Sequence, residues 1–179
     1  YTVKVKFYYA NMSENMRSTT HKISSICLIL AGYKAIHAHG GELSMFFFML
    51  GGIAGARSPD WLEVARWKTT TGWLWWKQAF RESWIPHRTI THWMLAWVVA
   101  VAVSTLSFIS TGTPGTALFL GFTASGLLHV FADWLTPMGV PFLLPWKRHS
   151  LKLIHGLRGE IVFIVGLFGI VLFLAHSSL

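Results

Sequence analysis

Residues 93–109 read WMLAWVVAVAVSTLSFI, a run without a charged side chain. Such a run is typical of a helix in lipid, because a helix satisfies its own backbone hydrogen bonds where water is absent. Four similar stretches complete the pattern: Ile23–Ala38, Leu43–Ala56, Thr116–Phe131 and Ile161–Ala175. The sequence therefore predicts an all-α, polytopic membrane bundle with about five apolar helices.

These stretches contain 14 to 17 residues each, whereas a helix needs roughly 20 residues to span a bilayer comfortably. Either the helices extend into their polar flanks, or some cross only partly. The first two stretches are interrupted by polar side chains, namely Lys34, His37, His39 and Glu42. We expect these two to form a helical hairpin that stops short of the far side.

Composition agrees with a membrane location. The chain is 53% hydrophobic and only 12% charged, whereas a soluble domain has roughly 25% charged residues. No stretch alternates apolar and polar residues as a transmembrane barrel requires. The net charge of +8 lies at the flanks of the apolar stretches, so we expect a lipid bilayer as partner and no nucleic acid. The single cysteine, Cys27, excludes an internal disulfide.

The distribution of basic residues predicts the orientation. If all five stretches cross and the N-terminus is cytoplasmic, 14 of the 15 lysines and arginines lie on the cytoplasmic side, and only Lys34 does not. Such a bias is typical of inner-membrane topology. We expect a multi-pass protein with a cytoplasmic N-terminus, in which residues 1–16 form a tail and residues 17–179 form the membrane domain.

The segment Arg57–Thr91 is the longest connection and holds six of the ten tryptophans. Trp73, Trp76, Phe80 and Trp84 follow helical spacing, with basic residues on another side. This pattern predicts an interfacial amphipathic helix; an ordinary aromatic belt that anchors the bundle is the alternative.

Ionisable groups at membrane depth are costly and are commonly functional. Under the predicted topology, seven of them gather at the cytoplasmic end: His21, Asp60, His87, His92, His129, Asp133 and Glu160. His129 and Asp133 are four residues apart, so a helix places them on one face within reach of one ion. Imidazole and carboxylate together suit Zn²⁺, or else Mn²⁺ or Fe²⁺. A lone membrane histidine is more often a core residue or a proton relay, but seven converging groups favour a metal site.

The motifs themselves resemble a known family. They are Thr20-His21, Ser58-Pro59-Asp60, Pro86-His87-Arg88-Thr89-Ile90-Thr91-His92, and His129 to Val140 with Asp133, Thr136 and Gly139. These are similar to the motifs of the YdjM-like family of bacterial inner-membrane, metal-dependent hydrolases, over about residues 17 to 165. The chain departs from the family pattern at Leu62, where relatives have a second aspartate, and at Glu63, where they have a histidine.

The resemblance implies a bacterial inner-membrane protein that holds one or two divalent ions. The predicted metal ligands are His21, Asp60, His87, His92, His129 and Asp133. In the expected reaction, Glu160 or Glu63 transfers a proton and Arg88 stabilises charge on a phosphoryl oxygen. The basic, tryptophan-rich face favours a lipid phosphoester as substrate. A structural metal site, or a metal or proton carrier, is the alternative, although carriers usually bind near the bilayer midplane.

Overall fold

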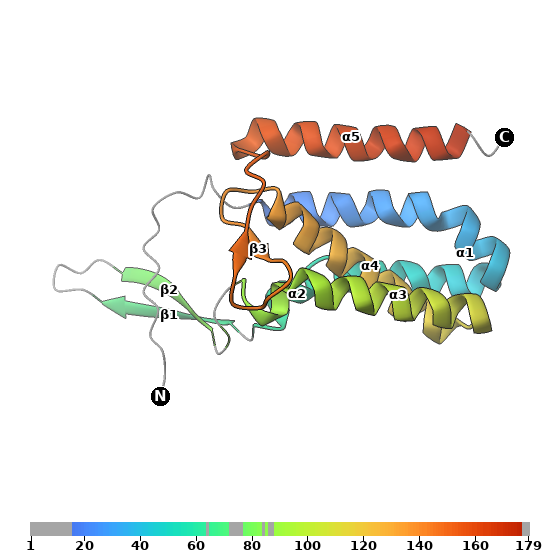
Figure 1. Cartoon of the computed structure of the whole chain (residues 1–179), viewed down its shortest axis with the longest axis horizontal. Helices are drawn as coiled ribbons and strands as arrows, with labels where there is room; N and C mark the ends of the chain where they lie inside the picture. Colours follow the sequence, from blue (N-terminus) through green and yellow to red (C-terminus); the bar gives the residue numbers. More distant parts are fainter. Residues whose placement is uncertain (1–15, 64, 72–76, 84, 86–87, 177–179) are drawn as a thin grey trace.

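A computed structural model describes residues 16–63, 65–71, 77–83, 85 and 88–176. The chain is mostly helical, which confirms the predicted helical class (Figure 1). The elements, in chain order, are α1 (Ser18–Gly55), α2 (Ser58–Trp61), β1 (Ala65–Thr71), β2 (Lys77–Ser83), the 3-10 helix η1 (Ile90–His92), α3 (Met94–Thr111), α4 (Pro114–Trp134), β3 (Val140–Pro141), β4 (Arg148–His149) and α5 (Gly156–His176).

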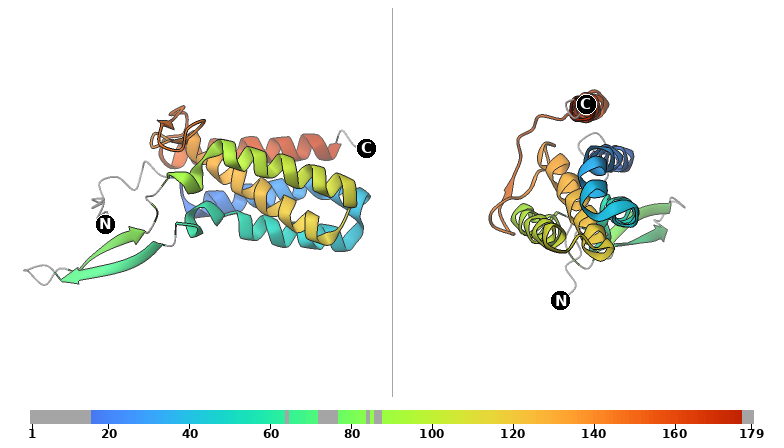
Figure 2. Two further views of the ribbon diagram at one scale, coloured as in Figure 1. Left: turned by 60° about the horizontal axis from the view of Figure 1, so that its bottom comes forward. Right: turned by 90° about the vertical axis from the view of Figure 1, so that its right-hand side faces the viewer.

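Helix α1 contains both of the first two apolar stretches and is sharply kinked between them. Gly41 has φ 73° and ψ −173°, a conformation that glycine adopts without steric cost. Beyond this kink the chain turns back along itself (Figures 1 and 2). Ile29 and Phe48, from the two halves, pack in one buried cluster. The structure thus shows the helical hairpin expected from the sequence.

Among the described residues, three helices are long and apolar enough to cross a membrane: α3, α4 and α5. Each extends beyond the apolar stretch that predicted it, as expected for helices that continue into polar flanks. Helix α1 does not qualify as a candidate span. The expectation of about five apolar membrane helices is therefore not confirmed, because polar residues interrupt both halves of α1.

The predicted interfacial helix is wrong. Residues 65–71 and 77–83 instead form two antiparallel strands, paired from Ala65 with Ser83 to Thr71 with Lys77. They project beyond the helices (Figure 2). Thr69, Thr70 and Thr71 are β-branched and favour extended backbone, whereas the helical pattern depended on four aromatic positions. Three of those, Trp73, Trp76 and Trp84, lie outside the described residues.

The second half of α1 packs very closely against α4. A Cβ atom added to Gly51 would lie 2.0 Å from the carbonyl oxygen of Leu118, and one added to Gly55 would lie 2.2 Å from that of Phe122. Glycines four residues apart let membrane helices approach to backbone contact. This contact places the C-terminal end of α1 beside the last turns of α4.

Candidate metal centre

Five of the predicted ligands come from four elements that begin or end at the same end of the bundle. His21 lies in the first turns of α1, Asp60 in α2 and His92 at the end of η1, while His129 and Asp133 lie near the end of α4. These element ends are adjacent in Figure 1. His87 lies outside the described residues. The structure thus brings together residues separated by up to 112 positions (21 to 133).

The side-chain nitrogen and oxygen atoms of these residues face one another. Nε2 of His92 lies 3.5 Å from Oδ2 of Asp133 and 3.7 Å from Oδ1 of Asp60. Nε2 of His129 lies 3.6 Å from Oδ2 of Asp133 and 4.0 Å from Oδ2 of Asp60. Nε2 of His21 lies 3.7 Å from Oδ1 of Asp133.

These separations suit a shared metal ion. Ligands bound tetrahedrally to Zn²⁺ at about 2.0–2.2 Å lie about 3.3–3.6 Å from one another. Among the described residues, two overlapping groups have candidate ligand atoms that all lie within 4.8 Å of one another: His21 with His129 and Asp133, and Asp60 with His92 and His129. Both groups use His129, so they describe one site.

His129 is oriented by the close contact between α1 and α4. Its Nδ1 lies 2.8 Å from the carbonyl oxygen of Ala56, which can only accept, so Nδ1 carries the proton and donates it. In the neutral ring Nε2 then carries a lone pair, which faces the two aspartates. A backbone carbonyl on the other ring nitrogen is the usual second contact of a metal-binding histidine.

His92 is held in a similar way by a buried carboxylate. Its Nδ1 lies 3.3 Å from Oε1 of Glu63, and both side chains are fully buried. The same carboxylate accepts hydrogen bonds from the backbone N–H of Arg88 at 3.1 Å and from the hydroxyl of Thr91 at 3.4 Å. Burial lowers the pKa of His92, against the opposing effect of Glu63 and Asp133. Burial therefore favours the neutral form of the His92 ring, which is the form that binds a metal ion.

Asp133 is fixed by Arg88, which is also buried. The guanidinium donates to Oδ1 of Asp133 at 2.7 Å and to Oγ1 of Thr136 at 3.2 Å. Arg88 has φ 57°, a left-handed conformation that is rare for residues other than glycine. This ion pair leaves Oδ2 of Asp133 facing His92 and His129.

The chemistry of these facing nitrogen and oxygen atoms indicates whether they suit a metal ion. The lone pair of His129 faces carboxylate oxygens of Asp133 and Asp60, and acceptors that face each other repel unless a cation or a proton lies between them. A proton satisfies one such pair, whereas five side chains converge here. The residues therefore fit a divalent cation with nitrogen and oxygen ligands.

Glu160 lies apart from these atoms. Its carboxylate accepts hydrogen bonds from the hydroxyl of Thr20 and, at 3.2 Å, from the backbone N–H of Arg17. It thus ties the start of α5 to the start of α1, beside His21. No group of candidate ligand atoms in the described part of the chain includes Glu160.

Three contributors to the site were not predicted from the sequence: the carbonyl of Ala56, the hydroxyl of Thr91 and the hydroxyl of Thr136. The first is a backbone group, which no residue pattern reveals. Thr91 and Thr136 both lie inside motifs of the resemblance, so their position within those motifs was the available signal.

Comparison with known proteins agrees with the motif resemblance. A family model described as YdjM inner membrane protein matches residues 16–178, nearly the whole chain. No curated protein and no solved structure gives a match. The resemblance to this family is confirmed, and the family description and the three candidate spans support a location in the inner membrane.

Proposed function

We propose the following function for this chain, which belongs to the YdjM inner membrane protein family: it binds one divalent metal ion, Zn²⁺ in the first place, and hydrolyses a phosphoester of an anionic lipid. The observation that carries this proposal is the convergence of three imidazoles and two carboxylates whose Nε2 and Oδ atoms lie 3.5–4.0 Å apart.

The contacts support one ion rather than two. His129 belongs to both groups of candidate ligands, and its Nδ1 is occupied by the carbonyl of Ala56. It therefore offers a single ligand atom. We assign His92, His129, Asp60 and Asp133 as ligands, with His21 completing the set. Zn²⁺ held by nitrogen and carboxylate ligands acts as a Lewis acid and makes water more acidic when bound.

The surrounding residues have distinct roles in this proposal. Glu63 holds the ring of His92, so its role is positioning rather than proton transfer. Arg88 orients Asp133 and keeps a positive charge beside the ion, where it can stabilise an anionic phosphoryl group. Asp60 is the most open of the ligands, with its side chain 26% exposed, whereas the other four are at most 4% exposed. The substrate therefore reaches the ion from the side of α2.

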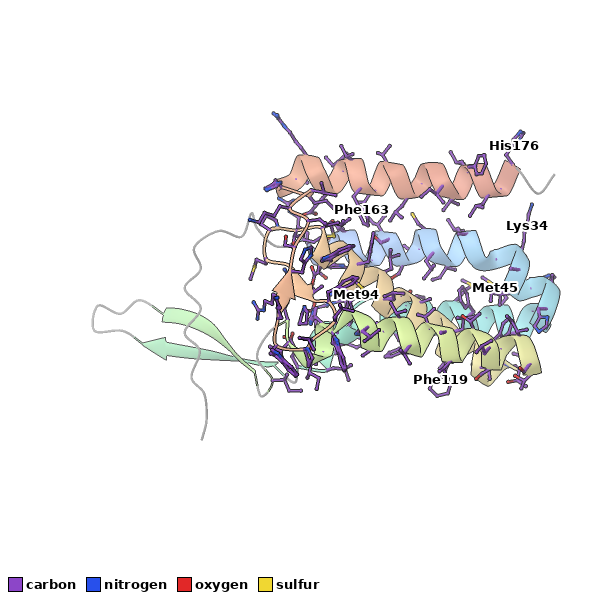
Figure 3. The ribbon with its side chains drawn as sticks, viewed as in Figure 1. Lys34, Met45, Met94, Phe119, Phe163 and His176 are labelled. Atoms are coloured by element: carbon purple, nitrogen blue, oxygen red, sulfur yellow. The ribbon has the colours of Figure 1, made fainter. Side chains whose placement is uncertain are left out.

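We place this end of the bundle at the cytoplasmic face. Fourteen of the 15 basic residues favour that side in the sequence. In the structure Lys34, the exception, lies at the opposite end of the bundle together with His176 (Figure 3). An anionic substrate is then attracted to the end that carries most of the positive charge.

A structural metal site is the second candidate. It is favoured by the burial of His92, His129 and Asp133, which are at most 2% exposed. Such a site would tie the ends of α1, η1 and α4 together without chemistry. The two functions predict different effects of Arg88→Lys. Lysine keeps the positive charge but lacks the planar guanidinium group that donates hydrogen bonds to Asp133.

The test is a hydrolysis screen on detergent-purified protein of measured zinc content. Phospholipids, isoprenoid phosphates and a chromogenic phosphodiester are offered with added Zn²⁺ or Mn²⁺. We expect turnover by the wild type and by His37→Gln, a matched histidine variant at the opposite end. Arg88→Lys should keep the metal and slow turnover, and Asp133→Asn should abolish it. Metal-loaded wild type that turns over none of these compounds supports the structural site and contradicts the enzymatic proposal.

A further inference from the structure

An apolar groove lies beside the metal centre, between the start of α5 and the chain that leads into it. The cavity measures about 350 Å³, within the range of small-ligand sites. Its apolar walls come from the end of α4, from the segment before α5 and from α5 itself: Leu135, Leu153, Ile154, Val162 and Phe163.

The backbone around this groove is fixed. The N–H groups of Leu153 and Ile154 both donate to the carbonyl of Leu135, at 2.8 and 3.0 Å. Phe163 packs against a buried cluster that contains Leu135 and Ile154, so it forms the inner wall. Val162, by contrast, is 72% exposed. The wall formed by Phe163 therefore packs against the interior of the protein, whereas the wall formed by Val162 is exposed.

A single cation lies among these apolar residues. Arg158 lines the groove, is exposed, and has no hydrogen bond or ion pair within the described part of the chain. It stands in the first turn of α5, which contains no acidic residue and where the free N–H groups of a helix add positive potential. The carboxylate of Glu160, two residues further on, accepts hydrogen bonds from Thr20 and from the backbone N–H of Arg17 instead. Apolar walls with an uncompensated cation match an anionic amphiphile.

We propose that this groove binds one anionic phospholipid, with an acyl chain along Leu153, Val162 and Phe163 and the phosphate on Arg158. The site is separate from the metal centre but adjacent to it. Leu135 lines the groove, and the next residue, Thr136, accepts a hydrogen bond from Arg88. The groove holds a lipid phosphate at the same end of the bundle as the ion. Binding itself does not rest on the proposed hydrolysis.

Native mass spectrometry of the full chain in detergent tests this site. The probes are phosphatidylglycerol and phosphatidylcholine with identical acyl chains. We expect wild type to retain phosphatidylglycerol about fivefold more than phosphatidylcholine, because one arginine near an anionic lipid contributes about 1 kcal/mol. Arg158→Gln should remove the preference, whereas Lys147→Gln, an exposed cation outside the groove, should keep it.

A second pair of variants tests the apolar wall. Val162→Trp should fill the groove and lower retention of both lipids, whereas Val165→Trp, similarly exposed but not lining the groove, should not. Equal retention of the two lipids by wild type, or an unchanged preference in Arg158→Gln, overturns the proposal. Zinc content is measured on the same samples. Wild type that contains zinc but shows no lipid preference contradicts the lipid site alone, and wild type that keeps the preference but contains no zinc contradicts the metal centre alone.

Discussion

Both ends of the helical bundle carry histidines, but in very different surroundings. At the end with the candidate metal centre, the three imidazoles of that site, His21, His92 and His129, are at most 4% exposed. At the other end the three histidines, His37, His39 and His176, are all exposed. Lys34 and His176 mark that end in Figure 3. The presence of histidines alone therefore does not mark a metal site.

The difference lies in what holds each ring. The carbonyl of Ala56 fixes Nδ1 of His129 and the carboxylate of Glu63 faces Nδ1 of His92, so that Nε2 of each ring points to the same place. His39 instead directs its Nε2 to the carbonyl of Ile109, at 2.9 Å. A ligand atom used in this way is not available to an ion. Burial and orientation, rather than the number of histidines, indicate the site.

Substitution of Asp133 should have the largest effect on metal affinity of all the substitutions at the two ends of the bundle. Asp133→Asn keeps the size of the side chain but removes the charge that faces three imidazoles, and it leaves Arg88 without its carboxylate partner. We expect metal affinity to fall by more than the roughly 100-fold seen for contacts outside the ligand set. Zinc titration of chelator-stripped protein measures this. Retention of wild-type affinity would show that Asp133 is not a ligand.

Glu63→Gln should have the next largest effect. The amide cannot hold the ring of His92 as the carboxylate does, so metal affinity should fall about 10–100-fold while the ligands themselves remain. The same zinc titration measures the loss, and circular dichroism checks that the helices are intact. An unchanged affinity would mean that Glu63 does not position His92.

The close contact of α1 with α4 predicts an intermediate effect for Gly55→Ala. The added methyl group would lie 2.2 Å from the carbonyl oxygen of Phe122, so the helices must move apart. We expect a loss of about 1–3 kcal/mol in stability, together with weaker zinc binding, because Ala56 moves away from His129. Thermal unfolding in detergent measures the first effect.

Gly166→Ala is the matched control for this prediction, because a Cβ atom at Gly166 in α5 meets nothing within 4 Å. It should leave zinc binding unchanged and not reduce stability, since alanine is the better helix former. Equal thermal stability of Gly55→Ala and wild type would contradict the packing account.

The smallest effect is expected at the opposite end of the bundle. His37→Gln replaces an exposed ring that stacks on Tyr33 at 5.7 Å between centroids. Zinc affinity should stay within about twofold of wild type, because surface substitutions rarely exceed 0.5 kcal/mol. A large loss of zinc in this variant would mean that the two ends are not functionally distinct.

The helices and most site residues could be predicted because their signals are local. Long apolar runs predicted α3, α4 and α5, and the four-residue spacing of His129 and Asp133 predicted that both lie on one helical face. Alternating helix directions then predicted one common end for His21, Asp60 and His92. The tail expected at residues 1–16 lies outside the described residues except for Met16, which packs in a buried cluster.

Other features depend on contacts that the sequence does not show. The strands β1 and β2 pair with each other between residues 65 and 83, whereas the spacing of four aromatic residues in this segment matched a helical pattern. The roles of Glu63 and Glu160 differ because of their neighbours: Glu63 contacts His92, whereas Glu160 contacts Thr20. In the sequence, these two carboxylates are equivalent candidates for proton transfer. Only the packing of α1, α4 and α5 shows that they have different neighbours and therefore different roles.

Zinc stoichiometry tests most directly whether the buried cluster of His21, Asp60, His92, His129 and Asp133 binds a metal ion. Detergent-purified protein is stripped with chelator, reloaded with Zn²⁺, freed of excess ion and analysed for zinc by elemental analysis. We expect one zinc ion per chain in wild type and in His37→Gln, and none in Asp133→Asn. Wild type that retains no zinc, or equal zinc in wild type and Asp133→Asn, would contradict metal binding by this cluster.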